Sequence, residues 1–146
     1  MRNDELAYQA REALCSYLQA QPCWDAFFTV TFKRPIRHTW SAIDRTAHAL
    51  LKSGRIGRAF IASERHLSGD FHTHGLVAYL PLLDGSPGEY SLEMAVTKSN
   101  FNRLGWSMVA HPRAVGQVTG YCAKYLTKAN VTDCEYDFLG TEWTRT

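Results

Sequence analysis

Two tyrosines and two lysines near the C-terminal end are spaced so that they could act together in one catalytic site. Residues 121–128 read Tyr-Cys-Ala-Lys-Tyr-Leu-Thr-Lys, so a tyrosine followed by two residues and a lysine occurs twice in succession. Side chains three and four positions apart project from one face of a helix. On a helix, this face carries Tyr121, Lys124, Tyr125 and Lys128.

A tyrosine in such a setting can act as a nucleophile towards phosphate. Its phenol has an ordinary pKa of about 10, so it needs a nearby cation or metal that favours the phenolate. We therefore predict that Tyr121 and Tyr125 are nucleophiles and that Lys124 and Lys128 support them electrostatically. The alternative is that the tyrosines pack at a core edge with lysines as a solvated rim. Core packing alone gives no reason to repeat the unit.

A possible metal site lies upstream, in the segment from Phe71 to Tyr79. Its alternation is that of a strand, which points His72 and His74 to one side of a sheet and Thr73 to the other. The two histidines are about 6 to 7 Å apart along the strand, so both imidazoles can reach one cation. Two imidazoles leave a cation under-coordinated, and we expect a carboxylate to join them.

Glu64, on the preceding predicted strand, is the best placed carboxylate, but its position depends on the strand register. If Arg65 faces Phe71, Glu64 lies opposite His72 on the same side of the sheet. A two-residue hairpin turn would instead set Glu64 against Thr73, on the other side. The alternative ligands in or near the turn are His66 and Asp70.

The expected ligand set of two histidines and one carboxylate, with open positions, suits Mg²⁺ or Mn²⁺ acting on a phosphate. Zinc would also accept these ligands. The metal would polarise a phosphoryl oxygen and neutralise charge as it builds. A half-buried pair of polar residues on a strand is the alternative interpretation of the two histidines.

Length and composition are those of one domain spanning residues 1–146. The 146 residues are 45% apolar and 12% aromatic, enough for a core without disulfides. The four cysteines have no CxxC spacing, and we expect reduced structural thiols. No apolar run approaches the roughly 20 residues of a membrane span, and the polar start is unlike a signal peptide. We expect a cytoplasmic protein.

Charge is unevenly distributed along the chain, although the net charge is only +2. Between Lys33 and Arg65 there are eight lysines or arginines against Asp44 and Glu64, so this stretch is locally about +6. A basic middle of this kind favours a groove for a polyanion, with a scattered solvated face as an equally weighted alternative.

The pattern of the remaining chain predicts helices and strands in mixed order. We expect helices over 3–20, from a cap at Thr39 to Gly54, and over 115–126, and the spacing of Leu92, Val96, Phe101 and Leu104 is compatible with a further helix. Strands are expected over 25–32, 58–65, 71–79 and 106–110. This order predicts an α+β fold: an antiparallel sheet of about four to five strands, helices packed on one face, and an open face that carries the active site.

The three segments together resemble the HUH endonucleases, and among them the two-tyrosine rolling-circle replication initiators of small phages and plasmids. Residues 27–32, Phe-Phe-Thr-Val-Thr-Phe, are similar to the first family motif, a strand associated with DNA. His72-Thr73-His74 resembles the metal motif, and residues 121–125 resemble the catalytic helix. The motifs follow the family's order and span most of the chain.

The resemblance implies a site-specific endonuclease and strand transferase for single-stranded DNA. Tyr121 would attack a phosphodiester, become linked to the 5′ phosphate and release a 3′ hydroxyl, while Tyr125 would attack a second junction. The partner would be single-stranded DNA at an origin or nick site, acted on by a monomer without membrane association. The residues that we assign to DNA contact are Thr29, Thr31, Lys33, Arg34, Arg37, Arg58 and Arg65.

Two features depart from the family. The residue between the histidines is usually hydrophobic, and Thr73 must find a hydrogen bond or stay partly exposed. The chain contains no GxxxxGK[ST] segment, so the helicase fused to many such initiators is missing and unwinding would fall to a host helicase, with a host DNA polymerase extending the 3′ hydroxyl.

Two other functions compete with replication initiation. A transposase or conjugative relaxase would use the same chemistry at the ends of a mobile element. A non-catalytic single-stranded nucleic-acid binder would instead stack bases on Phe28, Phe32 and Tyr79. The binder explains the basic middle but gives no task to the histidines and the tyrosine pair.

Overall fold

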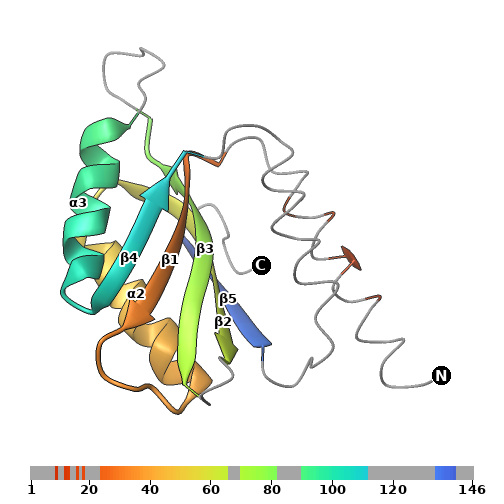
Figure 1. Cartoon of the computed structure of the whole chain (residues 1–146). Coiled ribbons are helices and arrows are strands. Elements are labelled where there is room, and N and C mark those ends of the chain that lie inside the picture. The colour runs from red at the N-terminus through yellow and green to blue at the C-terminus, as the bar shows by residue number, and fades with distance from the viewer. Residues whose placement is uncertain are drawn as a thin grey trace.

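The chain folds as an α+β domain around one antiparallel sheet (Figure 1). The computed structural model describes residues 24–65, 70–81, 90–111 and 134–140 and the single positions 9, 12, 13, 16 and 18; within 134–138 it describes the backbone. The elements are β1 (Ala26–Phe32), α2 (Thr39–Lys52), β2 (Ile56–Arg65), β3 (Phe71–Tyr79), α3 (Ser91–Asn102), β4 (Gly105–Ala110) and β5 (Cys134–Gly140). None of the helices in these described stretches is long and apolar enough to span a membrane.

The five strands lie in the order β4-β1-β3-β2-β5, and every neighbouring pair is antiparallel. This confirms the predicted fold class, and the four strands expected from the sequence all form. Of the helix predicted over 3–20 only single positions are described, and the helix predicted over 115–126 lies outside the described residues.

Both described helices cover the same face of the sheet, as Figure 1 shows. Alternate residues of the three central strands point to this face and are fully buried because α2 and α3 pack over them. The core they form contains Ala26, Phe28, Val30, Ala59, Ile61 and Val77 from the strands, Ile43 and Leu50 from α2, and Met94 and Phe101 from α3. The intervening residues of the same strands therefore point to the opposite face.

One local prediction for the helices is wrong. The residue that caps α2 is His38 rather than Thr39, whose hydroxyl lies against the hydroxyl of Ser63 on β2 instead. The third predicted helix forms as α3, although Leu92 and Val96, two of the apolar residues that indicated it, are 73% and 37% exposed.

The buried face of α3 is formed instead by Met94, Thr97 and Phe101. Thr97 occupies a core position because its hydroxyl donates to the carbonyl of Glu93 and lies 2.8 Å from the buried hydroxyl of Tyr79. A hydrophobicity pattern assigns a threonine to the surface, so such a pattern does not identify this buried face of α3.

Thr73, the polar residue between the two histidines, has the hydrogen bond that the sequence demanded. It is fully buried on the helix face, where its hydroxyl lies 2.8 Å from that of Thr46 on α2. Thr46 in turn donates to the carbonyl of Ala42, so it accepts from Thr73. This bond connects the centre of β3 to α2.

The fifth strand, β5, is absent from our sequence-based assignment. It pairs with β2 along its length, from Arg58 with Gly140 to Glu64 with Cys134. The residues from Cys134 to Phe138 alternate between apolar and acidic, which is the pattern of a strand and the signal by which it could be predicted.

Gly75 follows His74 on β3, and we expect its replacement by alanine to destabilise the fold. A Cβ at Gly75 would overlap the carbonyl oxygen of Phe60 and the ring of Phe28, which crosses the glycine. Because the obstacle includes backbone, Gly75→Ala should lower the free energy of unfolding by at least about 2 kcal/mol, measured by chemical denaturation. The control is Gly57→Ala, whose nearest contact would be the Ala78 carbonyl at 3.2 Å, and it should cost clearly less. Equal losses would contradict this account of Gly75.

Candidate metal centre

The register between β2 and β3 brings the three predicted metal ligands together. Arg65 pairs with Phe71, so Glu64 lies directly opposite His72, and Ala62 lies opposite His74. This is the register that our prediction of Glu64 as a ligand required. The three ligand side chains therefore share the face of the sheet opposite α2 and α3.

Both histidines aim the same ring atom at the one carboxylate. His72 Nε2 lies 3.8 Å from Glu64 Oε1, and His74 Nε2 lies 3.7 Å from Glu64 Oε2. The two imidazole rings stand edge to face, with centroids 4.5 Å apart. One ligand atom from each of the three residues lies within 4.8 Å of the other two.

These separations fit a shared cation. They are longer than the hydrogen-bond range of about 2.7–3.2 Å, so the carboxylate does not bond directly to these two nitrogens. Three atoms within 4.8 Å of one another have a common point at most about 2.8 Å from each, because that is the radius of the circle through an equilateral triangle of this side. A contraction of under 1 Å reaches the usual metal–ligand distances of about 2.0–2.2 Å.

Burial makes this ligand set costly without a balancing positive charge. The side chains of Glu64, His72 and His74 are only 10%, 8% and 12% exposed. A carboxylate withdrawn from water is stabilised by a cation or by hydrogen bonds. Nitrogen and oxygen donors of these types serve both hard divalent ions and zinc.

Thr29 on β1 orients one of the ligands. It pairs with His74 across the strands, and its hydroxyl lies 3.0 Å from Nδ1 of that ring. A hydrogen bond at Nδ1 leaves Nε2 as the atom that faces the carboxylate. Thr29, predicted as a DNA contact, therefore has a second possible task as the support of a metal ligand.

The alternative ligands are not part of the cluster as described. Asp70 is half-buried and lines a neighbouring hollow with Thr31 and Lys33. His66 lies outside the described residues. The predicted nucleophiles and lysines of residues 121–128 also lie outside the described residues.

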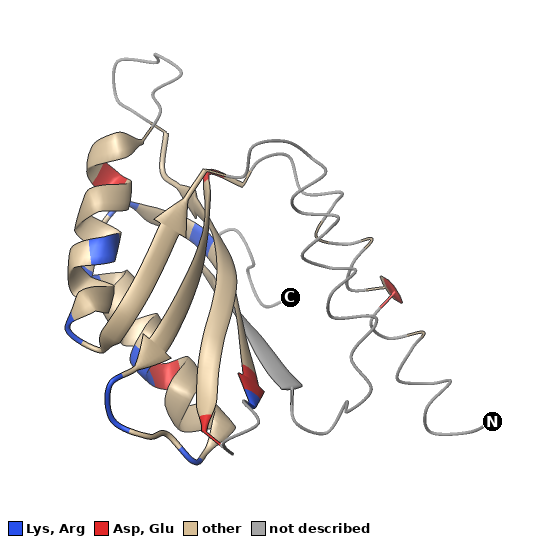
Figure 2. Cartoon of the chain, in the orientation of Figure 1, with Lys and Arg blue, Asp and Glu red and all other residues tan. Residues whose placement is uncertain are grey.

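The remaining residues predicted to contact DNA fall into two groups. Thr31 is exposed at the end of β1, beside His72, and the following connection to α2 carries exposed cations, as Figure 2 shows. These cations are Lys33, Arg34 and Arg37. Arg65, at the end of β2, is exposed and lies 4.9 Å over the ring of Phe71.

Arg58 forms the second group, because it is only 6% exposed and lies 5.0 Å over the ring of Trp24. Arg58 therefore packs within the protein, and little of its side chain is accessible to a polyanion.

Two of the aromatic residues that a stacking protein would use are in the core. Phe28 is fully buried, and Tyr79 is 5% exposed. Burial raises the pKa of Tyr79 to about 12, although its side-chain hydrogen bond with Thr97 acts to lower it. Phe32 is half-buried. Among the described side chains, Trp106 of β4 is an exposed aromatic residue on the site's face, and one tryptophan in a short strand has no sequence pattern that would single it out.

Comparisons of the chain with models of known protein families, with curated proteins and with solved structures find no match.

We expect Mn²⁺ to bind at this cluster and to depend on each of its ligands. His72→Ala and Glu64→Gln each remove a donor atom and should weaken Mn²⁺ binding by more than about 100-fold, measured by isothermal titration calorimetry. Thr29→Val removes the orienting hydroxyl and should weaken binding by about 10- to 100-fold.

The matched control for this experiment is Asp70→Asn, which neutralises a nearby carboxylate outside the cluster. Its Mn²⁺ affinity should equal that of the native chain. If Asp70→Asn instead weakens binding as much as Glu64→Gln does, the ligand set is wrong.

Proposed function

We propose that the protein is a metal-dependent nuclease and strand transferase that cuts single-stranded DNA through a tyrosine and initiates rolling-circle replication. The observation that carries the proposal is the convergence of Glu64, His72 and His74 on one sheet face. The repeated tyrosine and lysine unit in residues 121–128 supplies the chemistry that such a metal site would assist. The resemblance to HUH endonucleases connects the two.

Glu64, His72 and His74 would hold a divalent cation, Mg²⁺ or Mn²⁺, for action on the phosphodiester that is cut. When bound, the cation polarises a phosphoryl oxygen and offsets the negative charge that develops there. Thr29 keeps His74 in its binding orientation. The exposed cations between β1 and α2 bind the phosphates of the flanking strand.

Tyr121 performs the first step. Its phenol loses a proton, helped by Lys124 and Lys128, and the phenolate oxygen attacks the phosphorus. The bond from phosphorus to the 3′ oxygen breaks, that oxygen takes up a proton, and the 5′ phosphate stays on the tyrosine. One phosphodiester is exchanged for another, so the energy of the broken bond is kept.

Tyr125 performs the second step, on a new junction of the same strand. On the predicted helix, side chains four positions apart are about 6 Å apart, so one bound cation would be within reach of both phenols. The Tyr125 oxygen bonds to the phosphorus of the new junction, whose bond to the 3′ oxygen breaks and leaves a 3′ hydroxyl. That hydroxyl attacks the phosphorus on Tyr121, the bond from phosphorus to the Tyr121 oxygen breaks, the phenol takes up a proton, and a circle closes without an external energy source. We assign unwinding and extension to a host helicase and a host polymerase.

A denaturation-resistant protein–DNA adduct tests the proposal. Labelled single-stranded oligonucleotides, drawn from a library of sequences because the recognised site is unknown, are incubated with the protein and either Mn²⁺ or a chelator. We expect adduct only with the metal. Tyr121→Phe should remove most initial cleavage because the nucleophile is gone, Tyr125→Phe should mainly impair rejoining, and His72→Ala should abolish both.

Denaturing gel electrophoresis separates the adduct from the free strand, and far-UV circular dichroism checks that each variant is folded. A protein that binds the strands but forms no adduct with any of them is a non-catalytic binder. Full activity of all three variants would also overturn the proposal.

A further inference from the structure

Trp106 is an exposed indole in line with the metal ligands. It is 63% exposed, although tryptophan is usually among the more buried residues of a fold. Trp106 pairs with Thr31 of β1, and Thr31 pairs in turn with His72 of β3. Because residues paired in this way share a face, Trp106, Thr31, His72 and Glu64 form one row across the sheet.

The position of Trp106 within the row sets its distance from the metal. Adjacent strands lie about 4.8 Å apart, so the backbone of Trp106 is two strand spacings, or about 10 Å, from that of His72. Thr31, the residue between them, is exposed. The row thus leads from an open apolar ring, over a short polar side chain, to the buried cluster.

The backbone beneath the indole is closely held. A Cβ at Gly105, the residue before Trp106, would overlap the carbonyl oxygen of Thr31, so β4 and β1 approach as closely here as only glycine permits. The ladder continues one step further, where the backbone N–H of Lys33 donates to the carbonyl of Leu104 at 2.9 Å. A fixed backbone makes the ring a platform with a defined position.

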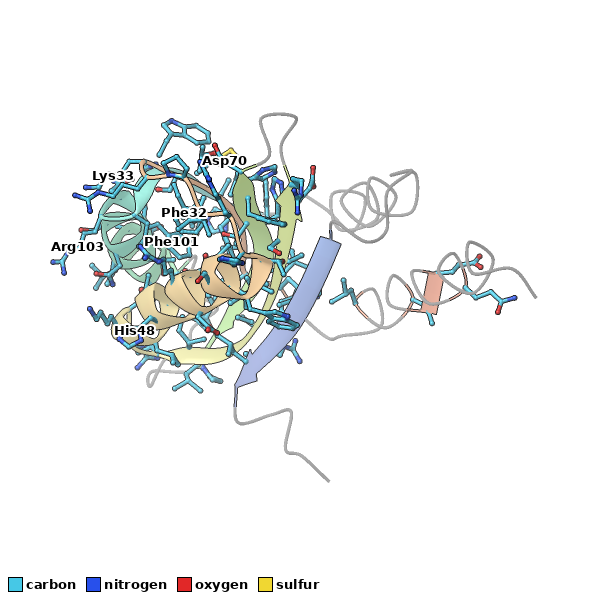
Figure 3. All side chains as sticks on the ribbon, turned by 90° about the horizontal axis from the view of Figure 1, so that it is seen from below. Phe32, Lys33, His48, Asp70, Phe101 and Arg103 are labelled. Carbon is cyan, nitrogen blue, oxygen red and sulfur yellow. The ribbon has the colours of Figure 1, made fainter. Side chains whose placement is uncertain are left out.

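Lys33 supplies positive charge near Trp106, and a hollow lies beside Thr31, the residue that pairs with Trp106. Lys33 is exposed, and it forms no ion pair with any residue of the described stretches. A hollow of about 320 Å³ begins at Thr31, and its charged side chains are Lys33 and Asp70. Figure 3 shows Lys33 and Asp70 on the side of the molecule away from His48 of α2.

We propose that Trp106 stacks on a base of the single-stranded DNA, close to the phosphodiester that the metal centre cuts, while Lys33 binds the adjoining backbone phosphate. The inference rests on the proposed function, which identifies the ligand as single-stranded DNA. It adds the residue that holds one of the bases of this DNA. An exposed aromatic ring close to a cation is the arrangement with which proteins bind single strands irrespective of sequence. Duplex DNA hides its base faces, so it cannot use this platform.

The experiment measures affinity for two probes by fluorescence anisotropy: a labelled oligodeoxythymidylate, and an abasic oligomer of equal length with the same phosphates. A chelator is present, so that no cleavage interferes. We expect Trp106→Ala to weaken binding of the oligodeoxythymidylate by about 5- to 150-fold and to leave binding of the abasic oligomer unchanged. Trp106→Phe should restore part of the loss because phenylalanine also stacks.

The matched control is Trp40→Ala, which removes a 51% exposed tryptophan from the helical layer. It should bind both probes as the native chain does. Lys33→Gln should weaken binding of both probes, since it removes a phosphate contact and no stacking surface. Retention of Mn²⁺ affinity in Trp106→Ala shows that the site's face is still folded.

The outcomes separate this inference from the proposed function. If Trp106→Ala binds the oligodeoxythymidylate as tightly as the native chain, the inference is wrong even where the native chain forms the covalent adduct. If base-dependent binding requires Trp106 but no oligonucleotide yields an adduct, the inference stands and the nuclease proposal fails. A change of oligomeric state in Trp106→Ala, without base-dependent binding, would mean that the indole contacts a second copy of the chain.

Discussion

The register between β2 and β3 is the constraint on which the whole site depends. Strand side chains alternate between the two faces, so a slip of one residue would move Glu64 into the helix-covered core and leave the histidines without their carboxylate. The observed pairing of Arg65 with Phe71 avoids this. Apolar packing enforces the register, because the same slip would remove Ile61 from the core beneath α2 and α3 and place the charge of Glu64 against α2.

The two faces of the sheet differ in their role: one packs against the helices, and the other carries the candidate metal centre. Towards α2 and α3 the strands present a core in which the polar exceptions, Thr73 and Ser63, each contact a hydroxyl on α2. On the other face, buried acid and imidazole groups lie next to exposed residues at the sheet's β4 edge. A DNA strand of the kind proposed would meet the exposed cations of the connection between β1 and α2 before it reached Glu64. Their attraction would offset the repulsion from that carboxylate.

Much of this arrangement follows from sequence patterns, and the failures have identifiable causes. The alternation of β3 and the apolar, aromatic and threonine-rich composition of β1 identified these strands, and the predicted metal ligands followed from spacing and from a register condition that the structure meets. The buried face of α3 did not follow from apolar spacing because Thr97 is buried through hydrogen bonds, which a hydrophobicity pattern does not register.

Other features depend on contacts between segments distant in the sequence. Arg58 looked like a DNA contact among other cations, yet its neighbour is Trp24, which precedes β1. Trp106 gained its significance only from its place in a row of paired residues across four strands. Single residues such as these carry no periodic signal, and only the folded sheet assigns them neighbours.

The alternation within β3 has a consequence for how the protein would respond to a bound ion. His72 and His74 face the cluster, while Thr73 between them is bonded to Thr46 on α2. A ligand that binds only the folded chain stabilises it by mass action, and here the strand that carries the ligands is the one that anchors a helix. Binding of an ion by Glu64, His72 and His74 would therefore slow amide hydrogen exchange in α2, on the far side of the sheet from the ion.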